Sequence, residues 1–247
     1  MPTSEAAREP VGNRLLAALP RAVYEGLRPH LETVSLGPGD VIYEPDGPIR
    51  HVYFPAGCIV SLVAIMGDGS MLELATVGKE GMVGVPLFLE TETAPFRSFT
   101  QVPGESLRLA ADVFRDTIGR SGTVVSLLHR YAQVLFNQVA WSAACNRAHS
   151  LEQRCARWLL MTHDRVDTDR FELTQEFLGQ MLGVHRPRVN RAAGAIQKAG
   201  VIRYVRGRVT VVDRKGLEDA ACECYRFIRD EYERLLESVI DFGQGGR

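Results

Sequence analysis

The chain has 247 residues, of which 45% are hydrophobic, and its 29 Lys and Arg nearly balance its 30 Asp and Glu. This length suggests about two domains, each with enough apolar residues for a core. No apolar run reaches membrane length and no basic-then-apolar leader is present, so we expect a soluble, cytoplasmic protein with no membrane partner.

The cysteines argue against a secreted disulfide framework, because their number is odd and their spacing irregular. Cys222-Glu-Cys224 is spaced more closely than the usual two-residue zinc hook, and no His/Cys pair lies near it in the sequence. We therefore expect no metal and no cofactor, and interpret the cysteines as buried or half-buried thiols. A redox or metal role stays open as the alternative. The cysteines are Cys58, Cys145, Cys155, Cys222 and Cys224.

The N-terminal half predicts an antiparallel β-roll of the double-stranded β-helix, cupin-like kind. Residues 13–31 favour short helices capped by Asn13 and broken at prolines. Residues 33–109 then alternate strand-like segments, including 81–89, with glycine or proline turns such as Gly67-Asp68-Gly69. We assign residues 13–120 to this domain.

Helical patterns follow the roll. Asp112 is the expected cap of a short helix ending at Ile118, and residues 119–122 the expected break. The helix predicted over 123–147 carries only two full charges and is apolar on more than one face. Its predicted seam includes Val124, Leu127, Leu128, Tyr131, Leu135, Gln138 and Ser142. We expect this helix (domain 121–148) to pack against the roll and a dimer partner; a core helix in a monomer is the alternative.

After a further helix over 150–164, residues 173–200 predict a helix-turn-helix. Thr174 is the expected N-cap of its first helix, and Gly183 suits a corner that needs a positive φ. Gly179, Gly183 and Val189 have the spacing of a helix-turn-helix. Gly179 is small where the two helices cross, and the β-branched Val189 packs beneath the corner. Such a unit reads DNA when its second helix carries groove-facing polar groups.

The basic residues of the chain gather in this region. Between Phe177 and Val212 there is no Asp or Glu, against seven Lys and Arg. Two β-rich runs, 201–205 and 209–212, meet at Gly207 and predict a wing whose arginines reach phosphates. A solvated basic face is the alternative. The predicted DNA-binding residues are Thr174, His185, Arg186, Arg188, Asn190, Arg191, Arg206 and Arg208.

This order of elements, α+β with a β-roll, a long helix and a winged helix-turn-helix, resembles the Crp/Fnr family of bacterial transcription regulators. The resemblance covers about residues 15–212 and is strongest over 154–160 and 173–202. It implies a homodimer held by the long helix, double-stranded DNA with two-fold symmetric half-sites, and RNA polymerase as a partner.

The resemblance places the family's base-reading arginine on Arg186. The family's following glutamate falls on Pro187, which cannot accept from cytosine, so the half-site should differ from that of the best-known members. Arg188 and Arg191 are further candidates for base and phosphate contacts. Asn190 either reads adenine or faces solvent.

The family's effector pocket is expected at Gly84, Val85, Arg97, Ser98 and Val139. Val85 stands at the ribose-binding glutamate position, and Val139-Ala140 replaces a Thr-Ser pair, whereas Arg97-Ser98 is retained and suits a phosphate. We therefore expect no control by cyclic AMP. Three alternatives stay open: the pocket is vestigial, binds another nucleotide, or responds to a partner protein.

Other sensing chemistries and an enzyme are disfavoured. The family's iron–sulfur sensors carry N-terminal cysteines, and residues 1–57 have none. The roll offers only His51 for a haem or a cupin metal. The predicted function is sequence-specific DNA binding through domain 149–213, followed by a helical extension (214–247) without an assigned role and expected as one helix over 215–242. The alternative is a sensing module, for a cyclic nucleotide or another small ligand, whose DNA binding requires an unidentified effector.

Overall fold

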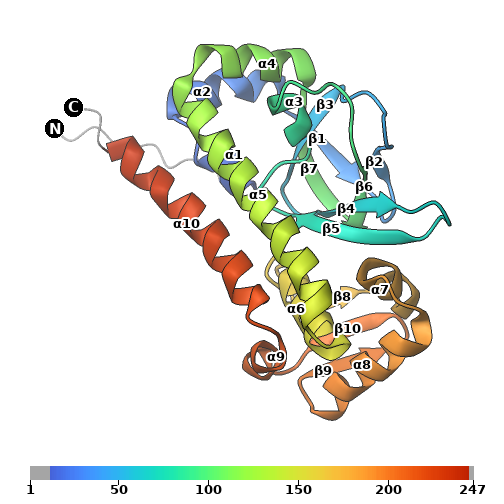
Figure 1. The fold of residues 1–247 in the computed structure, drawn as a ribbon. Coiled ribbons are helices and arrows are strands. Elements are labelled where there is room, and N and C mark those ends of the chain that lie inside the picture. Colours follow the sequence, from blue (N-terminus) through green and yellow to red (C-terminus); the bar gives the residue numbers. More distant parts are fainter. Residues whose placement is uncertain (1–11, 245–247) are drawn as a thin grey trace.

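The computed structural model describes residues 12–244, which form the predicted α+β fold (Figure 1). The β-roll consists of two antiparallel sheets with strand orders β1-β7-β3 and β2-β6-β4-β5. Its strands are β1 (Glu32–Leu36), β2 (Val41–Tyr43), β3 (His51–Pro55), β4 (Ile59–Ile65), β5 (Met71–Val77), β6 (Arg97–Val102) and β7 (Gly104–Ala110).

One predicted strand of the roll is a helix. Within the strand-like segment 81–89, residues Val85–Phe88 form α3. Gly84 has a φ of 114°, which turns the chain out of extended conformation, and Pro86 stands in the first turn of the helix, where it is favoured. The predicted corner at Gly67-Asp68-Gly69 does join β4 to β5, with Gly69 at a φ of 81°.

The N-terminal segment divides into α1 (Arg14–Ala17), α2 (Arg21–Leu27) and the 3₁₀ helix η1 (Arg28–His30). Asn13 caps α1 as predicted, its Oδ1 accepting from the Leu16 amide at 3.0 Å. The same side chain donates to the carbonyls of Pro55 and Gly81, both at 2.8 Å. It therefore ties the N-terminal helices to the roll.

The helices after the roll begin at other residues than the sequence predicts. α4 (Ala111–Arg120) is preceded by Ala110, so Asp112 is not its cap, and Asp112 accepts instead from the neighbouring Val113 amide at 2.8 Å. The predicted break over 119–122 is confined to Ser121, whose side chain caps the next helix.

The seam predicted for the next helix, α5 (Gly122–Ala148), packs against the rest of the chain. Tyr131 donates to the Met82 carbonyl at 2.8 Å, and Gln138 to the Thr76 carbonyl at 3.2 Å. A different stripe is exposed and repeats at intervals of three and four residues. The exposed stripe consists of Ser126, His129, Gln133, Phe136, Ala140, Ala143 and Arg147.

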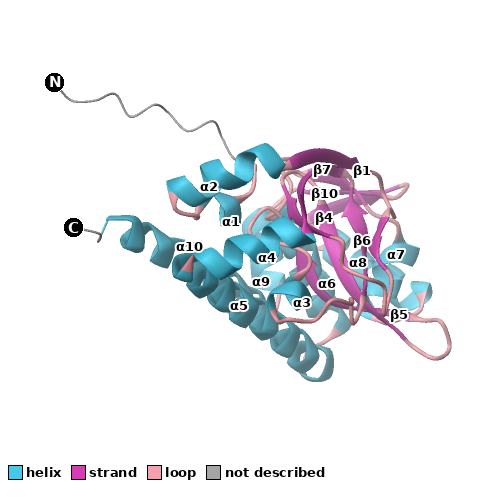
Figure 2. Ribbon diagram, turned by 90° about the horizontal axis from the view of Figure 1, so that it is seen from above, coloured by secondary structure: helices cyan, strands magenta, loops and turns pink. Residues whose placement is uncertain are grey.

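The C-terminal helix lies along α5 (Figures 1 and 2). The single helix expected over 215–242 is two helices, α9 (Arg214–Ala220) and α10 (Cys224–Gln244), and residues 245–247 of the expected extension lie outside the described range. Phe227 stacks on Trp141 with ring centroids 4.5 Å apart, and Tyr232 donates to Gln138 at 2.8 Å. Part of the α5 surface expected to meet a dimer partner therefore meets α10. No helix in the described part of the chain is long and apolar enough to cross a bilayer.

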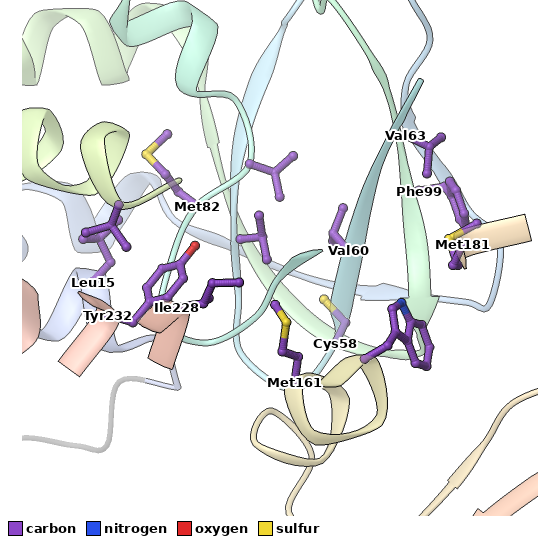
Figure 3. Close-up of a cluster of buried hydrophobic side chains, with 14 of the residues drawn as sticks. Leu15, Cys58, Val60, Val63, Met82, Phe99, Met161, Met181, Ile228 and Tyr232 are labelled. Carbon is purple, nitrogen blue, oxygen red and sulfur yellow. The ribbon is translucent and has the colours of Figure 1, made fainter. Parts of the chain in front are cut away.

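The roll and the C-terminal half share one hydrophobic core. Figure 3 shows buried side chains of the roll beside those of helices that follow it, such as Met161 from α6 (Leu151–His163) and Ile228 from α10. A buried ion pair joins Arg165, just after α6, to Glu80 of the roll at 2.7 Å. The Trp158 indole donates to Glu73 of β5 at 2.8 Å. These contacts set the position of the helix-turn-helix against the roll.

The cysteines are all buried thiols, as expected from the sequence, but three of them lie together. Cys222 and Cys224 border the break between α9 and α10, and there they meet Cys145 and His149 from the end of α5. Cys145 and Cys222 are 77 residues apart along the chain, so no local spacing could reveal the pairing.

Candidate nucleic-acid interface

The residues from which the sequence predicts a helix-turn-helix do form one. α7 (Gln175–Leu182) begins at Thr174, whose hydroxyl accepts from the Phe177 amide at 3.1 Å. Gly183 ends it with a φ of 65°. A Cβ on Gly179 would lie 2.8 Å from the Val184 carbonyl oxygen, so only glycine allows the chain after the corner to pass this close.

The second helix, α8 (Arg186–Lys198), separates an apolar face from a polar one. Val189, Ala192, Ala193 and Ile196 are buried and fix the helix on the domain. His185 precedes it as N-cap residue, and Pro187 pre-forms its first turn. The outward positions carry the predicted recognition residues, all of which are exposed: His185, Arg186, Arg188, Asn190 and Arg191.

The wing consists of β9 (Ile202–Val205) and β10 (Arg208–Val211), with β8 (Arg170–Glu172) on the other edge of β10. Arg206 and Gly207 form its tip with φ values of 49° and 76°, the left-handed pair that a tight hairpin requires. Tyr204 anchors the wing, because its hydroxyl donates to the Leu173 carbonyl at 2.9 Å. Burial raises the pKa of Tyr204, which keeps the phenol a neutral donor.

The arginines of this surface are available to an anion. In the described part of the chain, no carboxylate forms an ion pair with Arg186, Arg188, Arg191 or Arg206. Arg208 differs from expectation, since it lies 3.5 Å from the exposed Glu172 carboxylate. That contact is solvent-screened and weak.

Recognition helix and wing meet in a hollow of about 450 Å³. Thr174, Arg186 and Arg206 line it together with Tyr204 and Glu176. The structure thus brings three predicted site residues from α7, α8 and the wing into one place. Arg188, Asn190 and Arg191 lie outside the hollow along α8.

Two positioning residues are missing from the sequence-based prediction. Arg154 of α6 donates to the Leu182 carbonyl at the end of α7 at 2.6 Å, and its burial lowers its pKa. Gln197 of α8 accepts from the Tyr204 amide at 2.5 Å and holds the wing to the recognition helix. Neither contact leaves a signal in the sequence, because each depends on how two elements pack.

The expected effector pocket is a cavity of about 350 Å³ between α3, β6 and α5. Gly84, Val85, Ser98 and Val139 line it as predicted. Arg97 does not line it and pairs instead with Glu44 at 3.2 Å. Successive side chains of a strand point to opposite faces, so Ser98 faces inward while Arg97 does not.

A β-roll joined by a long helix to a winged helix-turn-helix with an exposed basic recognition helix defines a DNA-binding regulator with a sensor-type domain. Residues 153–220 match the Crp-like helix-turn-helix domain. The DNA-binding part of the chain is therefore a Crp-like helix-turn-helix domain by sequence.

Solved structures of low sequence identity share this fold. A Crp/Fnr-family regulator from Eubacterium rectale superposes with a TM-score of 0.66 at 19% identity, over 83% of this chain and 96% of its own. FixK2 from Bradyrhizobium japonicum gives 0.65 at 15%, over 78% and 98%. CLP of Xanthomonas campestris, described as a c-di-GMP responsive global regulator, gives 0.58 at 16%, over 78% and 99%. No curated protein sequence matches the chain significantly.

Proposed function

We propose that the chain is a sequence-specific transcription regulator that binds a two-fold symmetric DNA site as a homodimer and acts on RNA polymerase. The observation that carries the proposal is the hollow where Arg186 of the recognition helix and Arg206 of the wing lie together. Glu176 also lines the hollow, but no carboxylate of the described chain forms an ion pair with either arginine. A helix that enters the major groove and a wing that reaches phosphates both need arginines without an ion-pair partner on the surface that faces DNA.

The roles within the interface follow from position. Arg186, at the start of α8, reads guanine through a bidentate contact worth about 1–3 kcal/mol. Arg188 and Arg191 supply further base or phosphate contacts, and Asn190 either reads adenine or faces solvent. Pro187 offers no acceptor, so the half-site lacks the cytosine contact of a glutamate at this position. Thr174 lines the hollow, and His185 directly precedes α8. Arg206 and Arg208 contact the DNA backbone.

The homodimer forms through the exposed stripe of α5. Phe136 is 67% exposed there, beside the small Ala140 and Ala143. Spacings of three and four residues suit helix pairing about a two-fold axis. Such a pair presents two copies of α8 to successive major grooves, roughly 34–36 Å apart.

Control by cyclic AMP is not part of the proposal. The residues lining the 350 Å³ cavity include no charged side chain. A cyclic phosphate buried there would lack a counter-charge, which is unfavourable. The alternative function, in which DNA binding requires an effector, is favoured only for an uncharged apolar ligand in this cavity.

The test is selection from random duplex DNA by the full-length protein without added ligand. We expect enrichment of a two-fold symmetric sequence. Arg186→Ala removes one such contact from each half-site, about 2–6 kcal/mol in all, so it should lose at least about 30-fold in affinity for the selected sequence and relax preference at one base pair per half-site. Arg120→Ala, which removes an exposed charge from α4 of the roll domain, is the matched control and should bind as the wild type does. Enrichment unchanged by Arg186→Ala would refute the recognition assignment, whereas symmetric enrichment only with an apolar ligand would establish the alternative.

A second variant tests the proposed contact between the wing and the DNA backbone. Arg206→Ala should weaken binding to all duplexes by a similar factor and reduce the slope of log affinity against log salt by about two, one for each wing of the dimer. Binding at several salt concentrations, to the selected site and to a scrambled duplex, measures both effects. A changed base preference with an unchanged slope would contradict a backbone contact.

A further inference from the structure

Four potential metal ligands converge at the end of α5. The Sγ atoms of Cys145, Cys222 and Cys224 and a ring nitrogen of His149 all lie within 4.8 Å of one another. None of these four residues lines the hollow at the recognition helix or the apolar cavity.

The fold brings this set together from two directions. Cys145 and His149 are four residues apart, one helical turn, at the end of α5. Cys222 and Cys224 lie where α9 gives way to α10, and the packing of α10 on α5 places them opposite. The three cysteines are at most 4% exposed and form a small cluster with Trp141, separate from the main core.

Two of the distances between the four ligand atoms lie close to those of a tetrahedral zinc site. Zinc bonds of about 2.3 Å to sulfur and 2.0–2.1 Å to nitrogen place two thiolates about 3.8 Å apart and a thiolate and an imidazole nitrogen about 3.6 Å apart. Cys145 and Cys222 have their Sγ atoms 3.4 Å apart, and Cys224 Sγ lies 3.6 Å from His149 Nδ1. Small side-chain rotations therefore complete the tetrahedron.

The histidine is also oriented as a ligand. Its Nε2 lies 3.2 Å from the Glu223 carboxylate, while Nδ1 faces the thiols. A carboxylate on the outer ring nitrogen fixes the tautomer that leaves the inner nitrogen free to bind metal. Glu223 lies between the two cysteines of the Cys222-Glu-Cys224 segment. Three consecutive residues therefore supply two ligands and the carboxylate that holds His149.

We propose that Cys145, His149, Cys222 and Cys224 bind one zinc ion as a structural Cys3His site. Three thiolates and an imidazole select a soft or borderline cation over calcium or magnesium. Ligand atoms within 4.8 Å of one another enclose a single ion rather than a multi-iron cluster. All four positions are taken by protein, as in structural zinc sites. Binding deprotonates the thiols and needs no oxidant or reductant.

The ion would fasten α10 to α5 beside the DNA-binding domain. α6, the first helix of that domain, begins at Leu151, two residues after His149. The site thus lies where the long helix passes into the DNA-binding half. Loss of the ion should loosen α10 from α5 and with it the stacking of Phe227 on Trp141.

The decisive measurement is the metal content of full-length protein purified under reducing conditions, by mass spectrometry of the metal per chain. We expect one zinc per chain. After chelation, cobalt(II) should bind one equivalent with the intense d–d bands of tetrahedral geometry and the charge-transfer bands of thiolate ligation. No DNA is needed, so the result is independent of whether the proposed DNA-binding function holds.

Variants locate the ion. Cys222→Ser and His149→Gln should lower the zinc content at least tenfold, whereas Cys58→Ser, which changes a buried thiol of the roll, should retain it. Circular dichroism separates loss of metal from loss of fold, and the cobalt spectrum of the wild-type chain tests the site without any substitution. The proposal is overturned if reduced wild-type protein takes up neither zinc nor cobalt, if Cys222→Ser keeps full zinc content, or if Cys145 and Cys222 form a disulfide in place of a metal site.

Discussion

Glu73 is the carboxylate at the contact between the β-roll and the DNA-binding domain. It is partly buried on β5 and accepts from the Ser61 hydroxyl and the Trp158 indole, both at 2.8 Å. Burial raises the pKa of Glu73 to about 7, although both hydrogen bonds and the nearby arginines Arg157 and Arg165 favour the ionised form. A carboxylate that resists ionisation at the joint between two domains couples their contact to pH.

The expected pH dependence follows from the direction of this shift. The ordinary pKa is 4.5, so between about pH 4.5 and 7 the native chain binds more protons than the unfolded chain. The free energy of unfolding therefore falls as pH rises through this range. Glu73→Gln removes the ionisation and should be more stable relative to the wild type at pH 8 than at pH 5, by about 1–3 kcal/mol.

Urea unfolding of both proteins at pH 5 and pH 8 measures this difference. Glu105→Gln, which neutralises an exposed carboxylate of the same roll, should show no comparable change between the two pH values. If Glu73→Gln differed from the wild type equally at both pH values, Glu73 would not titrate in this range.

Two glycines of the helix-turn-helix test the helix crossing at the scale of the element. An added methyl on Gly179 would meet the Val184 carbonyl oxygen at 2.8 Å, whereas one on Gly194 of α8 meets nothing within 4 Å. Gly179→Ala should lower the free energy of unfolding by about 1–3 kcal/mol through overpacking. Gly194→Ala should raise it by about 0.5–1 kcal/mol, because alanine favours the helix.

Denaturant unfolding of the two single variants gives the comparison directly, since each adds the same methyl group to the same domain. Similar effects of both substitutions would show that Gly179 is not required for the close crossing.

The elements that the sequence predicts correctly are those set by neighbouring residues. The Thr174 cap, the Gly183 corner and the exposed basic face of α8 each depend on a few adjacent positions. The failures are of two kinds. Asp112 and residues 81–89 carry weak local signals that packing against the roll overrides.

The other failures involve contacts between distant segments. Tyr232 donates to Gln138 across 94 residues, and Cys145 meets Cys222 across 77. Periodicity indicates that α5 has too much apolar surface for one neighbour, but it cannot tell whether the second neighbour is α10 or another copy of the chain. Arg97 illustrates the same limit, because its place depended on which face of β6 turns inward.

At the scale of the whole molecule, α10 covers only one side of α5. The residues of α5 that meet it include Asn137, Gln138 and Trp141. Phe136 and Ala143 on the exposed stripe stay open to solvent. The exposed stripe, with Phe136 and two alanines at its middle, is the surface of α5 that we propose for a second copy.

If the proposed dimer forms through this stripe, Phe136→Glu should convert it to a monomer, because the two-fold interface would bury two carboxylates close together. Sedimentation equilibrium measures the mass, and affinity for the selected DNA site should fall at least a hundredfold as the second half-site is lost. Phe136 also lines the apolar cavity, so Ala143→Glu, which does not, is the second stripe variant and should act alike. Met66→Glu places the same charge on a side chain 53% exposed between β4 and β5 and should leave the mass unchanged. A protein that stays dimeric with both stripe variants would place the interface elsewhere, and α10 would be the next surface to test.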